Sequence, residues 1–206
     1  MSVDTNLIKS PYKREKFTAQ QVEEIVKCTQ DPQYFIENFV WIQHPVKGRM
    51  KFDLFDFQKG LLDAYHGHRY SIALISRQMG KSTAAAAYLL WYAMYVPDQT
   101  ILIAAHKYSG AQEIMQRIRF AYELLPDHVR AGVTAYNKGS LEFDNGSRII
   151  AQATTENTGR GLSISLAYLD EFAFVRPTIA REFWTSLSPT LSTGGKCIIT
   201  STPNQD

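Results

Sequence analysis

The sequence predicts an α/β fold in which a mostly parallel sheet is flanked by helices, with a helical extension before it. Three observations predict this fold. Apolar strand-like runs alternate with helix-like stretches from residue 71 onward, a Gly-Lys-Ser loop follows the first run, and a later run ends in two acids. Such alternation implies right-handed βαβ units, and 206 residues suit one domain with a sizeable core.

The first 16 residues are polar and include the basic side chains Lys9, Lys13, Arg14 and Lys16. We expect a loose, solvated basic arm over residues 1–16, with contact to DNA as the alternative. Residues 17–206 are expected to form the folded domain. In it, Thr18 is a candidate helix cap with Gln21 as a partial capping box.

Further elements are expected in the following order. The short helices cover 34–40, after Asp31-Pro32, and 54–65. A buried strand at 71–76, a helix at 81–96, a strand at 100–104 and a helix at 108–125 come next. Asn145-Gly146 lies between strand-like residues 141–143 and 148–150 and predicts a hairpin in which both turn residues have positive φ. A strand at 165–169, a helix at 178–191 and a strand at 196–200 complete the domain.

The segment from Ser76 to Thr83 is a candidate phosphate-binding loop of the Walker A kind, with the sequence Ser76-Arg77-Gln78-Met79-Gly80-Lys81-Ser82-Thr83. A strand delivers the chain, a tight turn exposes backbone N–H groups, and a helix N-terminus faces the anion. Lys81 can then reach the β- and γ-phosphates, and the Ser82 hydroxyl can ligate Mg²⁺. The usual pattern begins with a glycine, and here Ile75 stands at that position.

The run from Leu166 to Leu169 is followed by Asp170 and Glu171, as in the Walker B motif. Parallel α/β sheets place ligands at the carboxyl ends of their strands. We expect Asp170 to hold Mg²⁺ through water and Glu171 to polarise the attacking water. The alternative is a strand that ends in two solvated acids. Together the two motifs predict an enzyme that binds and hydrolyses ATP with Mg²⁺.

Composition sets few further limits. The net charge is +2, so a basic surface for nucleic acid would have to be local. Cys28 and Cys197 cannot form a disulfide framework and suggest structural thiols in a reducing compartment. No secretory signal is expected at the polar N-terminus. The longest apolar stretch, Ala84 to Val96, has 13 residues against roughly 20 for a bilayer span, so we expect a buried helix.

Taken in order, these segments resemble the ATPase domain of the large terminase subunit of tailed bacteriophages, of the T4-like kind. The resemblance covers roughly residues 17–206 and includes the phosphate loop without its leading glycine. It also includes Phe57-Gln58, Asp31-Pro32-Gln33-Tyr34-Phe35-Ile36, Tyr136-Asn137-Lys138-Gly139-Ser140, Asp144-Asn145-Gly146-Ser147, Asp170-Glu171 and Thr200-Ser201-Thr202-Pro203-Asn204. It implies a RecA-like (ASCE) P-loop NTPase.

The resemblance also implies roles for individual residues. Gln58, with Phe57, would recognise adenine; the alternative is a surface glutamine on an amphipathic helix. Arg77 would reach the γ-phosphate in cis and stabilise transition-state charge. The residues Thr200, Ser201 and Thr202 resemble the motif that couples hydrolysis to DNA movement.

Arg160 lies between Gly159 and Gly161, in a loop before the strand that carries Asp170. In ring motors, an arginine near this place is a candidate finger that acts on a neighbouring subunit's ATP. The alternative is a solvated arginine on a flexible loop.

The family implies a motor that drives double-stranded viral DNA into the prohead in the host cytoplasm, away from any membrane. Its implied partners are the portal protein, the small terminase subunit and further copies in a ring. Large terminases continue beyond the coupling motif into a small subdomain and a nuclease domain, whereas this sequence stops at Asp206. We therefore expect no nuclease site in this chain.

Two other interpretations stay open. One is a helicase-like ATPase that remodels nucleic acid, because an Asp-Glu pair followed by a sensor strand also occurs there. The other is a non-catalytic, truncated product that only binds nucleotide or portal.

Overall fold

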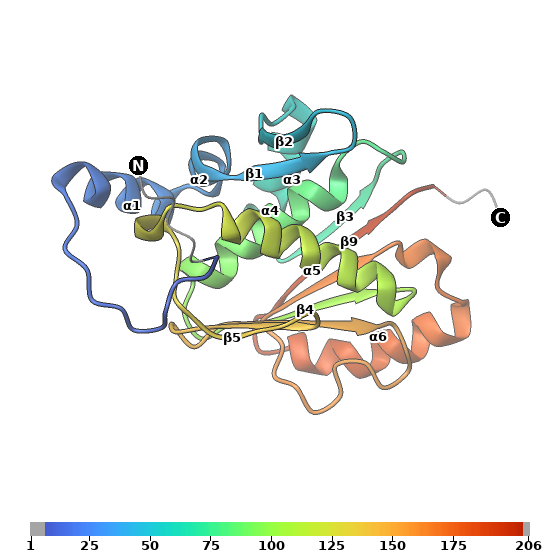
Figure 1. Ribbon diagram of the computed structural model, residues 1–206. Coiled ribbons are helices and arrows are strands. Elements are labelled where there is room, and N and C mark those ends of the chain that lie inside the picture. The colour runs from blue at the N-terminus through green and yellow to red at the C-terminus, as the bar shows by residue number, and fades with distance from the viewer. Residues whose placement is uncertain (1–6, 204–206) are drawn as a thin grey trace.

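The computed structural model describes residues 7–203 and contains a seven-stranded, mostly parallel sheet (Figure 1). The strands β3, β9, β8, β4 and β7 run parallel, and β6 and β5 continue the sheet antiparallel. In spatial order they are β3 Tyr70–Leu74, β9 Lys196–Ser201, β8 Leu166–Asp170, β4 Thr100–Ala105, β7 Arg148–Ala153, β6 Ser140–Phe143 and β5 Val133–Tyr136. The predicted α/β fold is confirmed.

Helices cover both faces of this sheet. Figure 1 shows α4 and α5 on one face and α6 on the other. The helices are α1 Ala19–Gln30, α2 Pro32–Phe39, α3 Asp56–Gly67, α4 Lys81–Tyr95, α5 Tyr108–Glu123 and α6 Pro177–Leu191, with short 3-10 turns η1 Asp127–Val129 and η2 Phe172–Phe174. A small hairpin of β1 Trp41–His44 and β2 Gly48–Lys51 packs beside α5.

Side chains of the central strand β4 alternate between two cores. Ile101 and Ile103 pack in the core under α4 and α5. Leu102 and Ala104 pack with residues of α6. A strand buried on both faces needs a continuous run of apolar residues. The strand at β4 was predicted from such a run.

The apolar stretch from Ala84 lies in α4, which is buried over most of its surface, as expected. Among the described residues, no helix is long and apolar enough to cross a membrane. Cys28 and Cys197 are both free and buried, and burial raises the pKa of the Cys28 thiol to about 11 and that of Cys197 to about 12. Both thiols therefore stay protonated at neutral pH.

Strand β3 differs from the expectation of a buried strand. It lies at the edge of the sheet, where it pairs with β9 alone. Tyr70, Ile72 and Leu74 share one face and are 50%, 73% and 63% exposed. The composition of a strand does not show whether it lies at the edge or in the centre of a sheet, because its position depends on which other strands pair with it.

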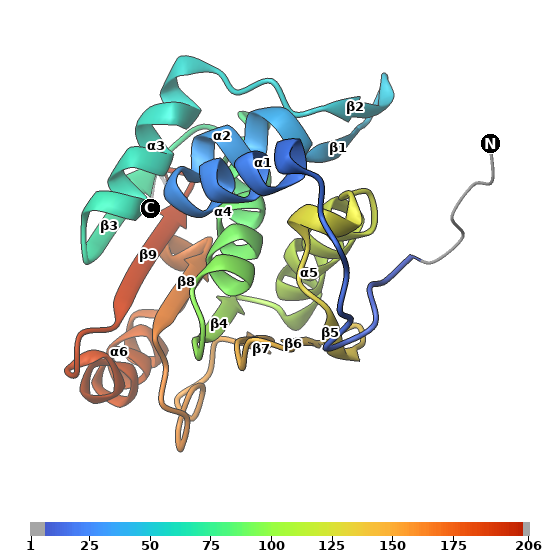
Figure 2. The ribbon, with the colours of Figure 1, turned by 90° about the vertical axis from the view of Figure 1, so that its left-hand side faces the viewer.

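Residues 7–12, part of the segment expected to be a loose arm, are hydrogen-bonded to the folded domain. The backbone N–H of Lys9 donates to the Tyr122 hydroxyl, and its carbonyl accepts from Val133 on β5. The Lys9 ammonium donates to the Asp127 carbonyl at 2.7 Å, and the Tyr12 N–H donates to Asp144. Residues 7–12 are thus docked against η1, β5 and the β6–β7 turn (Figure 2), and residues 1–6 lie outside the described part.

Local capping and turn signals were accurate to different degrees. Thr18 and Gln21 form the complete capping box that begins α1. The Asn145-Gly146 hairpin joins β6 and β7, but only Gly146 has a positive φ, of 87°. The Gly146 N–H donates to the Phe143 carbonyl, so the loop is the three-residue kind that ends in a left-handed glycine.

We predict that Gly146→Ala destabilises the fold, because a side chain is strained at this φ and its Cβ would lie 2.2 Å from an Asp98 carboxylate oxygen. The free energy of unfolding should fall by about 2 kcal/mol in denaturant titrations. Gly60→Ala is the matched control. Gly60 lies inside α3 with open space around its Cα, and alanine there should add up to about 1 kcal/mol. Equal effects of the two substitutions would contradict this account of the turn.

Candidate active site

The site lies where four parallel strands end together. Because β3, β9, β8 and β4 run in one direction, their carboxyl ends share one edge of the sheet. In register, Asp170 pairs with Thr200 on one side and with Ala105 on the other. The Ile75 N–H extends the β3–β9 ladder by donating to the Ser201 carbonyl at 3.0 Å. The start of the phosphate loop is thereby fixed beside the end of β9.

The phosphate loop turns sharply before α4. Gln78 has φ 62° and Gly80 has φ 75°, so the chain passes twice through the left-handed region. For a non-glycine residue such as Gln78 this conformation costs about 1 kcal/mol or more. Gly80 is the N-cap of α4, and its carbonyl accepts the first helical hydrogen bond, from Ala84. The backbone N–H groups at this helix end suit an anion.

Lys81 is the first residue of α4, and its ammonium lies 2.7 Å from Oε1 of Glu171. The Lys81 side chain is only 8% exposed, and that of Glu171 is 31% exposed. A lysine this deeply buried needs an opposite charge. The pair joins the first turn of α4 to the end of β8.

The other oxygen of the Glu171 carboxylate is held by β9 and the residue after it. Its Oε2 accepts from the Thr202 N–H and hydroxyl, both at 3.0 Å, and from the Ser201 hydroxyl at 3.4 Å. Burial opposes ionisation, but the hydrogen bonds from Lys81 and Thr202 hold the pKa of Glu171 below its ordinary value. Glu171 also has φ 50°, a strained conformation for glutamate, which turns the chain directly after Asp170.

Asp170 is in a different environment. Burial raises the pKa of its carboxyl, although the Thr200 hydroxyl donates to Oδ1 at 3.0 Å and opposes that shift. No described residue donates a hydrogen bond to Oδ2. The Ser82 hydroxyl and the Asp170 carboxylate are oxygen donors, the type of ligand that Mg²⁺ prefers. The residues present therefore fit the expected metal, as side chains that would hold it together with ATP.

Both ends of the Gln58 amide, a candidate for adenine recognition, make hydrogen bonds in the structure. Its side chain is buried, its oxygen accepts from the Phe55 N–H, and its nitrogen donates to the Gly80 carbonyl at 3.3 Å. In this conformation Gln58 links the start of α3 to the phosphate loop. Phe57 is partly exposed and stacks on the exposed Phe55, with ring centroids 6.0 Å apart. The sequence did not indicate that the Gln58 amide is hydrogen-bonded to the phosphate loop.

The two candidate arginines lie in separate places. Arg77 is exposed in the phosphate loop. Arg160 is exposed in the β7–β8 connection, on the face of the sheet that α6 covers, since a Cβ on Gly159 would contact Leu102 and Leu187. α4 and Lys81 lie on the opposite face. Arg77 is thus part of the phosphate loop, whereas Arg160 belongs to a separate, exposed segment.

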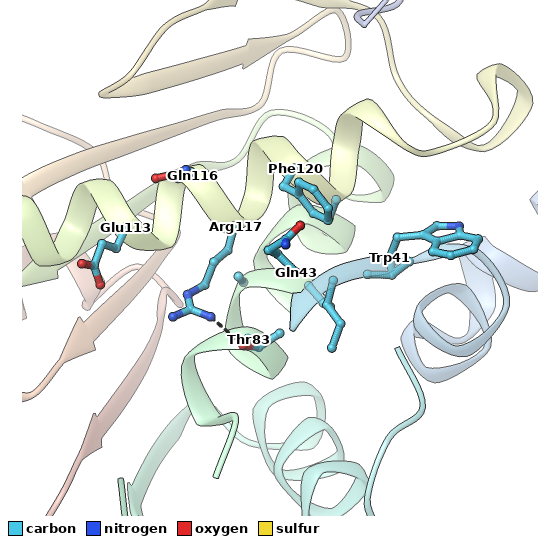
Figure 3. A pocket seen from close by; sticks show the side chains of 12 residues that line it. Trp41, Gln43, Thr83, Glu113, Gln116, Arg117 and Phe120 are labelled. Atoms are coloured by element: carbon cyan, nitrogen blue, oxygen red, sulfur yellow. Dashed lines mark hydrogen bonds between the residues drawn. The ribbon is translucent and has the colours of Figure 1, made fainter. Parts of the chain in front are cut away.

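One arginine beside the loop was missed. Arg117 on α5 donates to the Thr83 hydroxyl at 2.9 Å and lines a cavity of about 500 Å³ between β1, α4 and α5 (Figure 3). In this view Arg117 points from α5 towards the first turn of α4. No local pattern marks Arg117, because only the packing of α5 beside α4 places it here.

Comparison with known proteins identifies the family. Residues 72–206 match the family model described as "Terminase large subunit, T4likevirus-type, N-terminal". The chain belongs to this terminase family.

Solved phage terminases share the fold. The large terminase of bacteriophage HK97 superposes with a TM-score of 0.66 at 22% identity, over 84% of this chain and 37% of that one. The large terminase ATPase domain of Thermus phage P74-26 gives 0.59 at 23% identity, over 74% and 66% of the two chains.

The large terminase of a thermophilic bacteriophage, solved in complex with ATP-γ-S, gives a TM-score of 0.54 at 13% identity, over 72% and 38% of the two chains. This terminase chain thus spans between about a third and two thirds of the length of these solved chains.

We predict that Glu171→Gln tightens ATP binding, because ATP phosphates must compete with the Glu171 carboxylate for Lys81. Loss of a partly exposed ion pair of about 1 kcal/mol corresponds to roughly fivefold in the dissociation constant. Equilibrium binding of a fluorescent ATP analogue measures the change. Glu156→Gln, at an exposed position in the β7–β8 connection, is the control and should have no effect. Weaker binding by Glu171→Gln would show that the ion pair does not compete with nucleotide.

Proposed function

We propose that this chain is the ATPase motor domain of a phage DNA-packaging terminase, which hydrolyses ATP with Mg²⁺ to drive double-stranded DNA into the prohead. One observation carries the proposal. The buried Lys81 at the head of α4 lies within hydrogen-bond distance of the acid that follows β8, and residues at the end of β9 hold the same acid. Family membership supports the packaging role, and we propose residues 17–206 as the extent of the motor domain in this chain.

In this proposal the residues of the site divide the chemistry. Lys81, Arg77 and the backbone N–H groups of residues 76–83 bind the phosphates, and Ser82 and Asp170 hold the metal. Mg²⁺ would neutralise charge on the β- and γ-phosphates. Glu171, whose depressed pKa keeps it ionised at neutral pH, orients the attacking water and accepts its proton. Phe57 contributes an exposed aromatic face for adenine, with Gln58 positioning the loop.

Residues at the end of β9 provide the route to movement. Thr202 and Ser201 bind Glu171, and Thr200 binds Asp170. A movement of either carboxylate on hydrolysis would therefore change hydrogen bonds at the end of β9. We propose that this contact set couples the nucleotide to DNA, acting in a ring with the portal protein and the small terminase subunit in the host cytoplasm.

Binding and hydrolysis should separate between two variants. Lys81→Ala should weaken ATP binding itself, since it removes the phosphate ligand and leaves Glu171 as an unpaired charge. Glu171→Gln should bind ATP at least as tightly but hydrolyse it about a hundredfold more slowly, as expected for loss of a general base. Phosphate release and nucleotide binding measure the two effects, with Lys47→Ala at the exposed tip of the β1–β2 hairpin as the control.

Loss of binding in both variants would contradict this division of labour. Nucleotide binding without Mg²⁺-dependent turnover in the unmodified chain would instead favour the non-catalytic interpretation.

The placement of Arg160 leads to a separate prediction. We infer that Arg160, in the connection on the other face from α4, acts on the ATP of a neighbouring copy, whereas Arg77 acts within one chain. Hydrolysis per chain should rise with protein concentration, and Arg160→Ala should remove this rise. Arg77→Ala should lower the rate even in dilute solution. A dilute rate that depends on Arg160 and not on Arg77 would reverse the two assignments.

A further inference from the structure

A buried cluster of hydroxyl groups lies behind Asp170. Tyr168 is fully buried, and its hydroxyl lies 2.8 Å from Oγ1 of Thr200 and 3.3 Å from Oδ1 of Asp170. Thr200 is also fully buried, and its hydroxyl lies 3.0 Å from the same Oδ1. Three polar groups therefore form a closed triangle in the core.

The strand register builds this triangle. Asp170 pairs with Thr200 and Tyr168 with Ile198, so Tyr168, Asp170 and Thr200 lie on one face of adjacent strands. It is the face that also packs under α4, because Tyr168 belongs to the core shared by α4 and α5. The Tyr168 side chain reaches two residues along the strands to the carboxyl edge.

Counting protons gives the direction of the hydrogen bonds. Two hydroxyls have one proton each, so at most two of the three contacts can be hydrogen bonds at once. An ionised carboxylate only accepts. The two shorter contacts are satisfied together if Tyr168 donates to Thr200 and Thr200 donates to Asp170. Such a chain strengthens each member, since every donor is polarised by the next.

These hydrogen bonds give the two carboxylate oxygens of Asp170 different surroundings. Oδ1 accepts from inside the protein, while Oδ2 has no donor among residues 7–203. A phenylalanine would fill the core equally well, so packing alone does not explain a hydroxyl at this depth. The hydroxyl has a use if the orientation of the carboxylate matters.

We propose that Tyr168 is a positioning residue for magnesium. Through the Thr200 hydroxyl it fixes Oδ1 of Asp170, so that Oδ2 is presented to Mg²⁺ directly or through water. The inference rests on the proposed function, in which Asp170 faces the metal of Mg²⁺–ATP, and adds a residue that does not touch metal or nucleotide. Partners of this outer kind typically change metal affinity by about 10- to 100-fold.

Tyr65 on α3 offers a matched control. Its side chain is as deeply buried, and the charge on Asp170 contributes, after burial, to raising the pKa of its hydroxyl. Yet the hydroxyl makes no hydrogen bond to any described residue. Tyr65→Phe therefore removes a buried hydroxyl near the same carboxylate and leaves the hydrogen bonds from Tyr168 to Thr200 and from Thr200 to Asp170 intact.

The test is a Mg²⁺ titration of the binding of a fluorescent, non-hydrolysable ATP analogue, repeated in EDTA. Tyr168→Phe should raise the Mg²⁺ concentration at half-saturation about tenfold, leave the affinity in EDTA unchanged, and so differ from a general loss of structure. Thr200→Val should act in the same direction, and Tyr65→Phe should match the unmodified protein. If Tyr168→Phe fails to fold, Thr200→Val decides the question.

Asp170→Asn separates the two hypotheses. If it shifts the Mg²⁺ dependence and neither Tyr168→Phe nor Thr200→Val does, the positioning role is wrong and the proposed site stands. If Asp170→Asn also leaves the Mg²⁺ dependence unchanged, the metal site itself is wrong. An equal shift by Tyr65→Phe would overturn the proposal, since burial and not the hydrogen-bond chain would then be the cause.

Discussion

The ion pair between Lys81 and Glu171 is the interaction on which the site depends. It joins the first turn of α4 to the residue after β8, across a distance of 90 residues in the chain. Removing either partner would leave the other charge uncompensated, which is unfavourable for an ammonium as buried as that of Lys81. A phosphate group offers Lys81 the same compensation that Glu171 now gives. Under the proposed function, nucleotide would therefore replace Glu171 without leaving the ammonium unpaired.

The two partners of this pair have different surroundings. Lys81 begins α4, a helix that is buried over most of its surface. Glu171 and Gln78 are both non-glycine residues with positive φ. Strained backbone persists where neighbouring contacts hold it, and here the contacts of Thr202 hold Glu171. Release of Lys81 would leave Glu171 bound to the end of β9 alone, and in the proposed function this contact links nucleotide occupancy to that strand.

Local sequence signals predicted the elements whose cause is local. The apolar runs of β8 and β9, the buried helix α4 and the capping box at Thr18 were all found from side-chain patterns within each segment. The β1–β2 hairpin and β5 were not predicted, because their strands are four residues long and half-exposed. Docking of Lys9 onto Tyr122 and Val133 depends on contacts more than 110 residues apart, which no local pattern encodes.

The same division holds for the site. The order of the motifs was enough to predict that Lys81, Asp170, Glu171 and Thr200 lie at one edge of the sheet, because parallel strands place their carboxyl ends together. It could not show that the Gln58 amide is engaged by Gly80, that Arg117 reaches Thr83, or that a tyrosine hydroxyl stands behind Asp170. Those contacts are set by how helices and strands pack.

The most direct test of the account is a crystal structure of this chain with Mg²⁺ and a non-hydrolysable ATP analogue. The account predicts that the Lys81 ammonium contacts a phosphate oxygen and lies beyond hydrogen-bond distance of Glu171, while Glu171 keeps its contacts with Thr202. A nucleotide bound with the 2.7 Å contact between Lys81 and Glu171 intact would contradict it.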